Sequence, residues 1–456
     1  MRRSLARLRA LSAFRALPAS DLGHSLAKGA GIALLAQVLG VGIGYGTQLL
    51  LTRWMGASGY GAYDFSITLG NFLAFLAGFG LPKVLLRFIP VYIITQDWNR
   101  LQGIIWGSWW QTCINGLLLA AVGTVCVHWL DAQIGVSYAV LIIAGLWTVP
   151  LQALMNLHVE MSRGIERIGL AYMPWLVAWP LLLLVGAIAW RQTGQVLTGI
   201  SAIALSMGAL AIAIGIQLWR FRHHVSTQLR SVSPTFDIRL WLMTALPLIF
   251  IDGSSVILNQ TDILMLGSLS GTQAVGIYSA ALKTASWVSV VLVAVNAIAA
   301  PNFAKLYAQG DRQMLQKVVS TVAYWIFIPA FILTLGLIVF AVPILQWFGD
   351  EFEVARWSLI ALAIGQLVNV GSGSVGYLMM MTGHQNQMAQ VFAASAVVNL
   401  VLNAIAIPHI GILGASLATA FSMSLWNLWL YALVVKHVGV RPSIWAALRR
   451  RANLST

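Results

Sequence analysis

Three charged side chains, Asp252, Asp262 and Lys283, lie in stretches that are otherwise almost wholly apolar. Charged residues inside membrane segments normally face the bundle interior or a water-filled path, and they mark ion, proton or substrate sites. Asp262 and Lys283 lie equally far from the turn at residues 272–273, so we expect them at similar depth on antiparallel neighbours. Either these two residues pair, or Lys283 binds an anionic substrate while Asp262 holds it in place and contributes to ion coupling.

Asp252 lies ten residues before Asp262, which is about 15 Å of helix. It has no nearby basic partner in the sequence, and burial disfavours the charged form of a carboxyl group. We therefore predict Asp252 to couple transport to a proton or a sodium ion. The alternative is a hydrogen-bonded residue at a helix kink. No cofactor is expected beyond such a coupling ion.

A second cation, Arg87, lies one turn after Lys83 at the predicted end of the second span. Arg87 either extends to the lipid headgroups or lines the inner mouth of a cleft. Amide side chains in the second half can hydrogen-bond sugar hydroxyls, although bonds between helices explain them equally well. The amides predicted to bind substrate are Asn259, Asn296, Asn399 and Asn403. No metal site is expected, because the acidic residues 349–353 have no His or second acidic cluster beside them.

Small and helix-breaking residues recur in the first and seventh predicted spans. Gly and Pro weaken the backbone hydrogen-bond ladder of a membrane helix, and a cavity or neighbouring groups can satisfy the freed polar atoms. We predict hinges or cavity walls at these positions, with close helix packing as the alternative. The predicted hinge residues are Gly42, Gly44, Pro247 and Gly253.

The elements that position these residues are membrane helices. Hydrophobic residues make up 59% of the 456-residue chain and charged residues only 9%, which excludes an ordinary soluble domain. A spanning helix needs about 20 mainly apolar residues. The sequence predicts an all-α polytopic membrane protein with twelve spans, at residues 28–51, 62–82, 102–127, 138–159, 169–190, 195–219, 241–268, 275–300, 318–345, 355–381, 388–407 and 410–435.

The formal net charge of +14 follows the predicted topology, so it does not indicate nucleic-acid binding. All but four of the 27 Lys and Arg residues fall in cytoplasmic segments if the N-terminus is cytoplasmic. The positive-inside rule then predicts that both termini are cytoplasmic. The basic segments at residues 1–27, 220–240 and 436–456 are expected to contact anionic membrane lipids.

The chain repeats itself. Residues Gly61 and Tyr63 recur as Gly276 and Tyr278, both at an offset of 215 residues, and Gly56 recurs as Gly271 at the same offset. We predict two six-helix lobes, residues 28–219 and 241–435, joined by the linker 220–240. Because six spans return the chain to the side on which it began, the repeats are parallel, and the ligand site is expected between them.

The segment from Gln260 to Tyr307 contains Asp-Ile-Leu-Met-Leu-Gly at 262–267 and Val-Gly-Ile-Tyr-Ser at 275–279. Together with Trp-Phe-Gly at 347–349 and Ile-Pro at 407–408, it resembles the bacterial polysaccharide-export flippases of the O-antigen type. These belong to the multidrug/oligosaccharidyl-lipid/polysaccharide exporter superfamily. The resemblance covers essentially the whole chain.

The resemblance implies a transporter, not an enzyme, with two lobes around a central cavity in the bacterial inner membrane. Its substrate would be an undecaprenyl-pyrophosphate-linked oligosaccharide, with Lys283 and Arg87 as cations for the diphosphate. We expect a monomer that works beside a polysaccharide polymerase or other assembly proteins. Because about twenty residues follow the last predicted span, a lipid II flippase with extra helices is not expected.

Two alternatives compete with the flippase reading. A cation-coupled multidrug antiporter of the related multidrug-extrusion family would share the architecture, but a lysine in the membrane suits an anionic cargo better. A multispan glycosyltransferase or polymerase would need a sizeable outer loop for its active site. The predicted outer loops are too short for one.

Overall fold

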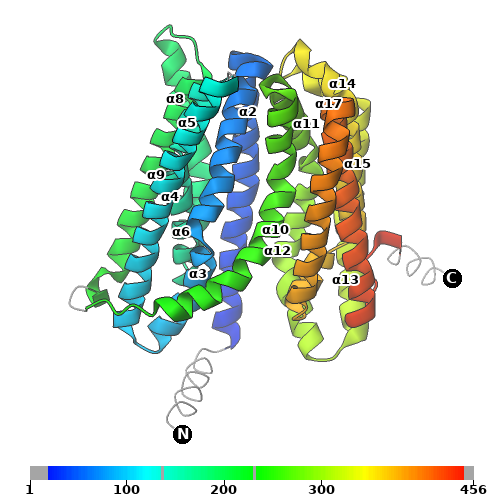
Figure 1. Ribbon diagram of the computed structural model, residues 1–456. Coiled ribbons are helices and arrows are strands. Elements are labelled where there is room, and N and C mark those ends of the chain that lie inside the picture. The colour runs from blue at the N-terminus through cyan, green and yellow to red at the C-terminus, as the bar shows by residue number, and fades with distance from the viewer. Residues whose placement is uncertain (1–18, 135–137, 230–232, 446–456) are drawn as a thin grey trace, which may run out of the picture.

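The computed structural model describes residues 19–134, 138–229 and 233–445. Most of the predicted basic segment 1–27 and residues 446–456 of the predicted tail lie outside this part. The described chain is a bundle of long helices (Figure 1), and both of its ends lie on one side of the bundle, called here the terminal side. The other side is called the opposite side.

The first half of the bundle contains the elements up to residue 229. They are α2 (Ala19–Gly78), α3 (Leu81–Ile94), α4 (Trp98–Ile134), α5 (Ala139–Leu146), α6 (Val149–Gly164), α7 (Ile168–Met173), the π-helical turn η2 (Pro174–Ala178), α8 (Trp179–Gln192) and α9 (Gly199–Leu229).

The second half begins within the predicted linker, because α10 starts at residue 238. Its elements are α10 (Ile238–Ser270), α11 (Thr272–Ala285), α12 (Trp287–Ala308), α13 (Arg312–Val339), α14 (Ala341–Gln346), the 3-10 turn η3 (Asp350–Ala355), α15 (Arg356–Gly371), α16 (Val375–Met381) and α17 (Gln385–His437).

The twelve predicted spans are recovered once two merged helices are divided. The described residues contain 8 helices long and apolar enough to cross a membrane, or 10 when two bent pairs each count as one span. Helix α2 joins two helices across a non-helical Gly56, and α17 joins two across Ile410 and Gly411. Counting α2 and α17 twice gives twelve.

The repeat is visible in the backbone. Gly56 and Gly271 both adopt positive φ, 70° and 85°. Directly after each of them, on the opposite side of the bundle, a new helix begins. A side chain is unfavourable in this conformation, which explains why both repeats place glycine there. The two helices that follow, the second part of α2 and α11, lie side by side at the centre of the bundle (Figure 1).

Gly61 and Gly276, which are equivalent in the two repeats, face each other across this central contact. A Cβ atom built on Gly61 would lie 2.6 Å from the backbone nitrogen of Gly276. A Cβ atom on Gly276 would in turn collide with the carbonyl oxygen of Ala57. The absence of side chains therefore lets the two helix backbones touch.

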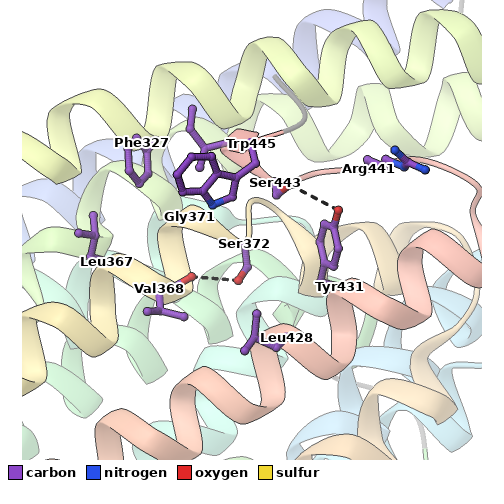
Figure 2. Close-up of a pocket in the computed structure, with 11 residues that line it drawn as sticks. Phe327, Leu367, Val368, Gly371, Ser372, Leu428, Tyr431, Arg441, Ser443 and Trp445 are labelled. Atoms are coloured by element: carbon purple, nitrogen blue, oxygen red, sulfur yellow. Dashed lines mark hydrogen bonds between the residues drawn. The ribbon is translucent and has the colours of Figure 1, made fainter. Parts of the chain in front are cut away.

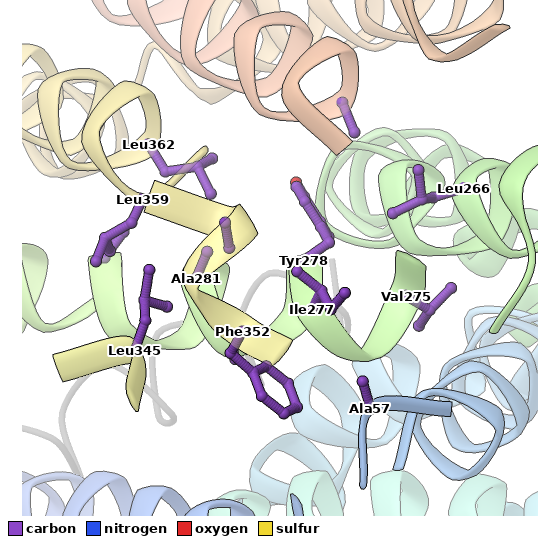
Figure 3. Packing of buried hydrophobic residues seen from close by; sticks show 14 of the residues in the cluster. Ala57, Leu266, Val275, Ile277, Tyr278, Ala281, Leu345, Phe352, Leu359 and Leu362 are labelled. Atoms are coloured by element: carbon purple, nitrogen blue, oxygen red, sulfur yellow. The ribbon is translucent and has the colours of Figure 1, made fainter. Parts of the chain in front are cut away.

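A hydrophobic cluster surrounds this contact on the opposite side (Figure 3). Tyr278, Phe352 and Leu359 are fully buried in it, and Ala57 contributes from the first repeat. Between membrane helices such side chains stabilise a contact through close van der Waals packing, because lipid chains are as apolar as the side chains themselves. The cluster fixes α11, η3 and α15 of the second repeat against α2 of the first.

Helix α10 bends by 43° between residues 238–250 and 252–270. The first part packs on the first half of the molecule, where Trp241 is buried and donates a hydrogen bond from its ring nitrogen to the Tyr92 hydroxyl, 3.1 Å away. The second part belongs to the second half. The bend lies between Pro247 and Gly253, two of the predicted hinge residues.

Candidate site between the two repeats

Lys283 of α11 pairs with Asp64 of α2, not with Asp262. Its Nζ lies 2.8 Å from Oδ1 of Asp64 and donates to the hydroxyl of Tyr60, also at 2.8 Å. Ser279, one turn earlier on α11, donates from Oγ to Oδ2 of Asp64 at 2.6 Å. The Asp64 carboxylate is therefore held by two residues of the other repeat.

The predicted pairing of Asp262 with Lys283 is wrong. Asp262 is 2% exposed and accepts hydrogen bonds from the Tyr278 hydroxyl, the Thr419 hydroxyl and the backbone N–H of Ile263. All of these groups belong to the second half, and none is a cation. A buried carboxyl group with several donors is satisfied without a charged partner, so Asp262 helps hold α10, α11 and α17 together.

A cavity of about 400 Å³ lies beside the Lys283–Asp64 pair, mainly within the first half. The Lys283 side chain is 40% exposed and the Asp64 side chain 8%. Of the described residues that line the cavity, Lys283 is the one basic residue. The polar and aromatic side chains in the wall are Tyr45, Thr47, Gln48, Tyr60, Tyr63, Thr68, Asn71, Trp179, Ser286 and Trp287.

The predicted second cation does not line this cavity. Arg87 is exposed, and its guanidinium carbon lies 5.7 Å from the centroid of the Phe88 ring. The neighbouring Lys83 is instead paired with Glu160 at 2.8 Å, and Arg163 contacts the same carboxylate at 2.7 Å. This ion-pair network joins α3 to α6 and was not predicted from the sequence.

Asp252 lies half-buried at the bend of α10. The charges that act on its carboxyl group are those of Lys83 and Glu160. The sequence argument did not consider Lys83 as a neighbour of Asp252, because Lys83 belongs to the other repeat, and Lys83 is itself ion-paired with Glu160. The predicted role of Asp252 in ion coupling stays a prediction.

None of the four predicted sugar-binding amides lines the cavity. Asn259 is exposed and donates to the carbonyl oxygen of Ser255. Asn399 and Asn403, four residues apart on α17, are buried and bonded to each other, and Asn399 also donates to Ser422. Asn296 is fully buried, and neither atom of its amide has a hydrogen-bond partner.

Helix α2 is not interrupted at Gly42 and Gly44, since its one non-helical residue is Gly56. A Cβ atom on Gly42 or Gly44 would meet nothing within 4 Å, so these two glycines do not provide close packing. Gly44 lines the cavity. Gly40 differs, because a Cβ atom there would lie 2.7 Å from the carbonyl oxygen of Leu176.

Glu351, in the acidic segment 349–353, has a structural role. Its Oε1 accepts the backbone N–H of Ala57 at 2.6 Å, directly after the break at Gly56. The first N–H groups of a helix lack partners within it. Glu351 therefore supplies a partner from the other repeat. No group of three or more His, Cys, Asp or Glu in the described part of the chain is arranged to hold a metal ion.

Asp64 is the main residue that sequence reasoning missed. It lies at the margin of a predicted span, where a charge looks unremarkable. One signal was present: Asp64 follows Tyr63 as Ser279 follows Tyr278, at the same offset of 215 that defines the repeat.

Two repeats of six membrane helices, with an ion pair between them in the wall of a cavity, form an architecture suited to a transporter. Residues 26–307, more than half of the chain, match the family described as polysaccharide biosynthesis protein, and residues 247–405 match the MatE family. The chain belongs to the polysaccharide biosynthesis protein family.

One curated relative is the "Probable low-salt glycan biosynthesis flippase Agl15" of Haloferax volcanii. It is 24% identical over 402 residues, which cover 86% of this chain and 79% of the relative. Its name describes a glycan biosynthesis flippase, as the sequence resemblance had implied for this chain.

Solved transporters share the fold. The inward-facing conformation of a multidrug resistance MATE family transporter of the MOP superfamily gives a TM-score of 0.62 at 14% identity, covering 95% of this chain and 96% of that one. A MOP superfamily transporter from Pyrococcus furiosus gives 0.55 at 13% identity, covering 89% and 95%. These similarities confirm the predicted twelve-helix, two-lobe fold.

Proposed function

We propose that this protein is a flippase that moves an undecaprenyl-pyrophosphate-linked oligosaccharide from the inner to the outer leaflet by alternating access. The observation that carries the proposal is the position of Lys283, a cation of the second repeat in the wall of a cavity that lies mainly within the first half. The family and the glycan flippase named above support it.

Lys283 retains the capacity to bind an anion while it is paired. An ammonium group has three N–H donors, and Asp64 and Tyr60 accept two of them. The side chain is 40% exposed, so the third donor is available to a ligand oxygen in the cavity. A diphosphate supplies several strong acceptors and a negative charge, which suit this position.

The remaining cavity wall suits the sugars of such a substrate. Gln48, Thr68 and Asn71 provide amide and hydroxyl groups, and Trp179 and Trp287 provide aromatic faces. The lipid tail would remain in the bilayer while the headgroup occupies the cavity. Together these groups fit a polar, anionic ligand better than a hydrophobic cation.

The Lys283–Asp64 pair also suggests how binding is linked to movement. Each partner comes from a different repeat, so the pair helps to hold the repeats together. A diphosphate bound at Lys283 competes with Asp64 for the same ammonium group. Weakening this ion pair favours separation of α2 and α11 at the Gly61–Gly276 contact, which would open the bundle on the opposite side.

Further parts of the proposal concern topology and coupling. We place both termini in the cytoplasm, because basic residues concentrate in the terminal-side segments. We further propose that the protein is a monomer in the inner membrane of a bacterium. Asp252 is the proposed coupling group for a proton or sodium ion, with Asp262 as the less accessible alternative. The proposed assembly partner is a polysaccharide polymerase, since such an enzyme consumes the flipped product.

Purified protein in vesicles tests this function. A lipid-linked oligosaccharide placed in the inner leaflet should become accessible to external periodate at a rate that depends on the protein. Lys283→Ala should lower this rate at least tenfold, whereas Lys317→Ala, at an exposed lysine of α13 outside the cavity, should not. An equal rate for Lys283→Ala and wild type would overturn the proposed role of Lys283. A wild-type rate no higher than the rate in protein-free vesicles would overturn the proposed function.

The match of residues 247–405 to the MatE family keeps a cation-coupled multidrug antiporter as the second candidate. The same vesicles separate the two. Efflux of a lipophilic cation driven by a proton or sodium gradient, with no change in glycan accessibility, would favour the antiporter.

A further inference from the structure

A second cavity, of about 500 Å³, lies in the second half of the molecule, away from Lys283 (Figure 2). Its walls come from α13, α15 and α17, and the segment after α17 completes it. The lining residues are Phe327, Leu367, Val368, Gly371, Ser372, Leu428, Tyr431, Arg441, Ser443, Ile444 and Trp445. This lipid-side groove, as we call it, takes no part in the proposed transport site.

The segment that completes the groove is fixed in place. The backbone N–H of Arg441 donates to Oε1 of Gln316 at 2.7 Å, and the side-chain amide of Gln316 donates back to the Arg441 carbonyl at 3.0 Å. Gly373, with φ of 79°, allows a close approach, because a Cβ atom there would collide with the Pro442 carbonyl. The groove is therefore bounded by ordered chain.

The entrance of the groove is polar and positively charged. Arg441 is exposed, and no carboxylate in the described part of the chain forms an ion pair with it. The Ser443 hydroxyl donates to the Tyr431 hydroxyl at 3.4 Å, and both lie on the same side of the groove as Arg441 (Figure 2). Trp445 is 74% exposed at the edge. Basic and aromatic residues together are typical of a membrane–water interface.

The interior and the rim of the groove are apolar. Phe327, Leu367 and Val368 form the wall, and Leu428 is 57% exposed. Exposed side chains about one turn away on the same two helices are also hydrophobic, with Phe331 of α13 at 40% and Ile364 of α15 at 48%. A surface of this kind faces lipid chains, since a water-filled path for a sugar would be lined by polar groups.

We propose that the lipid-side groove binds an anionic glycerophospholipid, with its phosphate at Arg441 and Ser443 and an acyl chain along Phe327, Leu367 and Leu428. The charge of the entrance favours an anionic headgroup over a zwitterionic one. The site does not depend on the identity of the transported substrate.

Lipid retention by the purified protein tests this site. Delipidated protein is mixed with phosphatidylglycerol or phosphatidylethanolamine, and bound lipid is counted by native mass spectrometry. Wild type should retain phosphatidylglycerol preferentially. Arg441→Ala should weaken this preference about fivefold, the effect expected for one basic residue at an anionic membrane surface, and Arg441→Lys should keep most of it.

Two further variants make the result specific. Lys317→Ala removes a charge from the same side outside the groove and should leave the preference unchanged. Leu428→Trp fills the groove without changing charge and should lower retention of both lipids. Equal phosphatidylglycerol retention by wild type, Arg441→Ala and Leu428→Trp would overturn the proposal. Displacement of phosphatidylglycerol by undecaprenyl phosphate, with the same dependence on Leu428, would also overturn it, because the groove would then hold the substrate's lipid tail.

Discussion

Asp64 and Ser279 occupy equivalent positions in the two repeats, and their side chains are hydrogen-bonded to each other, with Ser279 Oγ 2.6 Å from Asp64 Oδ2. Equivalent residues can meet in this way only near the axis that relates the repeats. The replacement of a carboxylate by a hydroxyl at that position makes the centre asymmetric. Lys283, one turn further along α11, then completes the charge of the site.

The Asp64–Lys283 pair should contribute to stability. Asp64→Asn leaves the ammonium group without its counter-ion, and we expect a loss of about 1–3 kcal/mol, reduced from the cost for a fully buried pair because Lys283 is partly exposed. Thermal unfolding in detergent measures this loss. Asp64→Asn combined with Lys283→Met should be less destabilising than the sum of the two changes, and simple additivity would show that the pair is not coupled.

The Gly61–Gly276 contact should control closure of the opposite side. Gly276→Ala places a methyl group against the backbone of the other repeat. The two helices must then separate, so cysteines introduced near this contact should react faster with an impermeant reagent added from the opposite side. Gly208→Ala is the matched control, since a Cβ atom there meets nothing within 4 Å. Unchanged labelling of Gly276→Ala would show that the contact yields without opening.

The two glycines predicted as a hinge in α2 should affect movement without affecting packing. Gly42→Ala with Gly44→Ala adds methyl groups to open space and favours the helix by roughly 1 kcal/mol for each residue. We expect an equal or higher melting temperature and slower flipping. Gly40→Ala should instead lower the melting temperature, because its methyl group meets the Leu176 carbonyl. Normal flipping by the double variant would remove the hinge role of Gly42 and Gly44.

Asp252 should couple transport to an ion. A unit charge that crosses the full membrane potential gains about 2.3 kcal/mol per 100 mV. Asp252→Asn imitates the neutral form, so flipping by this variant should no longer respond to an imposed gradient. Flipping is measured in vesicles with and without the gradient, and Ser268→Ala, at an exposed serine of the same helix, is the control. A full gradient response of Asp252→Asn would exclude Asp252 as the coupling group.

The bend in α10 shows what a local pattern can predict. Pro247 and Gly253 lie on either side of the 43° bend, where their weak backbone hydrogen bonding suggested a hinge. The same reasoning failed for α2, because the glycines at 42 and 44 continue a regular helix and the break occurs at Gly56. Glycine permits a break, but the surrounding contacts determine where the helix ends.

The sequence by itself determined the membrane class, the number of spans, the duplication and the family resemblance. These follow from hydropathy and from residue spacing, which are properties of the chain. It also placed Asp262 and Lys283 at similar depth, but depth does not specify the direction in which a side chain points.

Only the tertiary structure decided the partners. At 3.6 residues per turn, Lys283 is rotated about 140° around α11 from Tyr278 but only about 40° from Ser279. Tyr278 therefore faces Asp262 and the second half, whereas Ser279 and Lys283 together face Asp64 of the first. The charged centre of the protein thus arises from the packing of one repeat against the other, which no single span of the sequence contains.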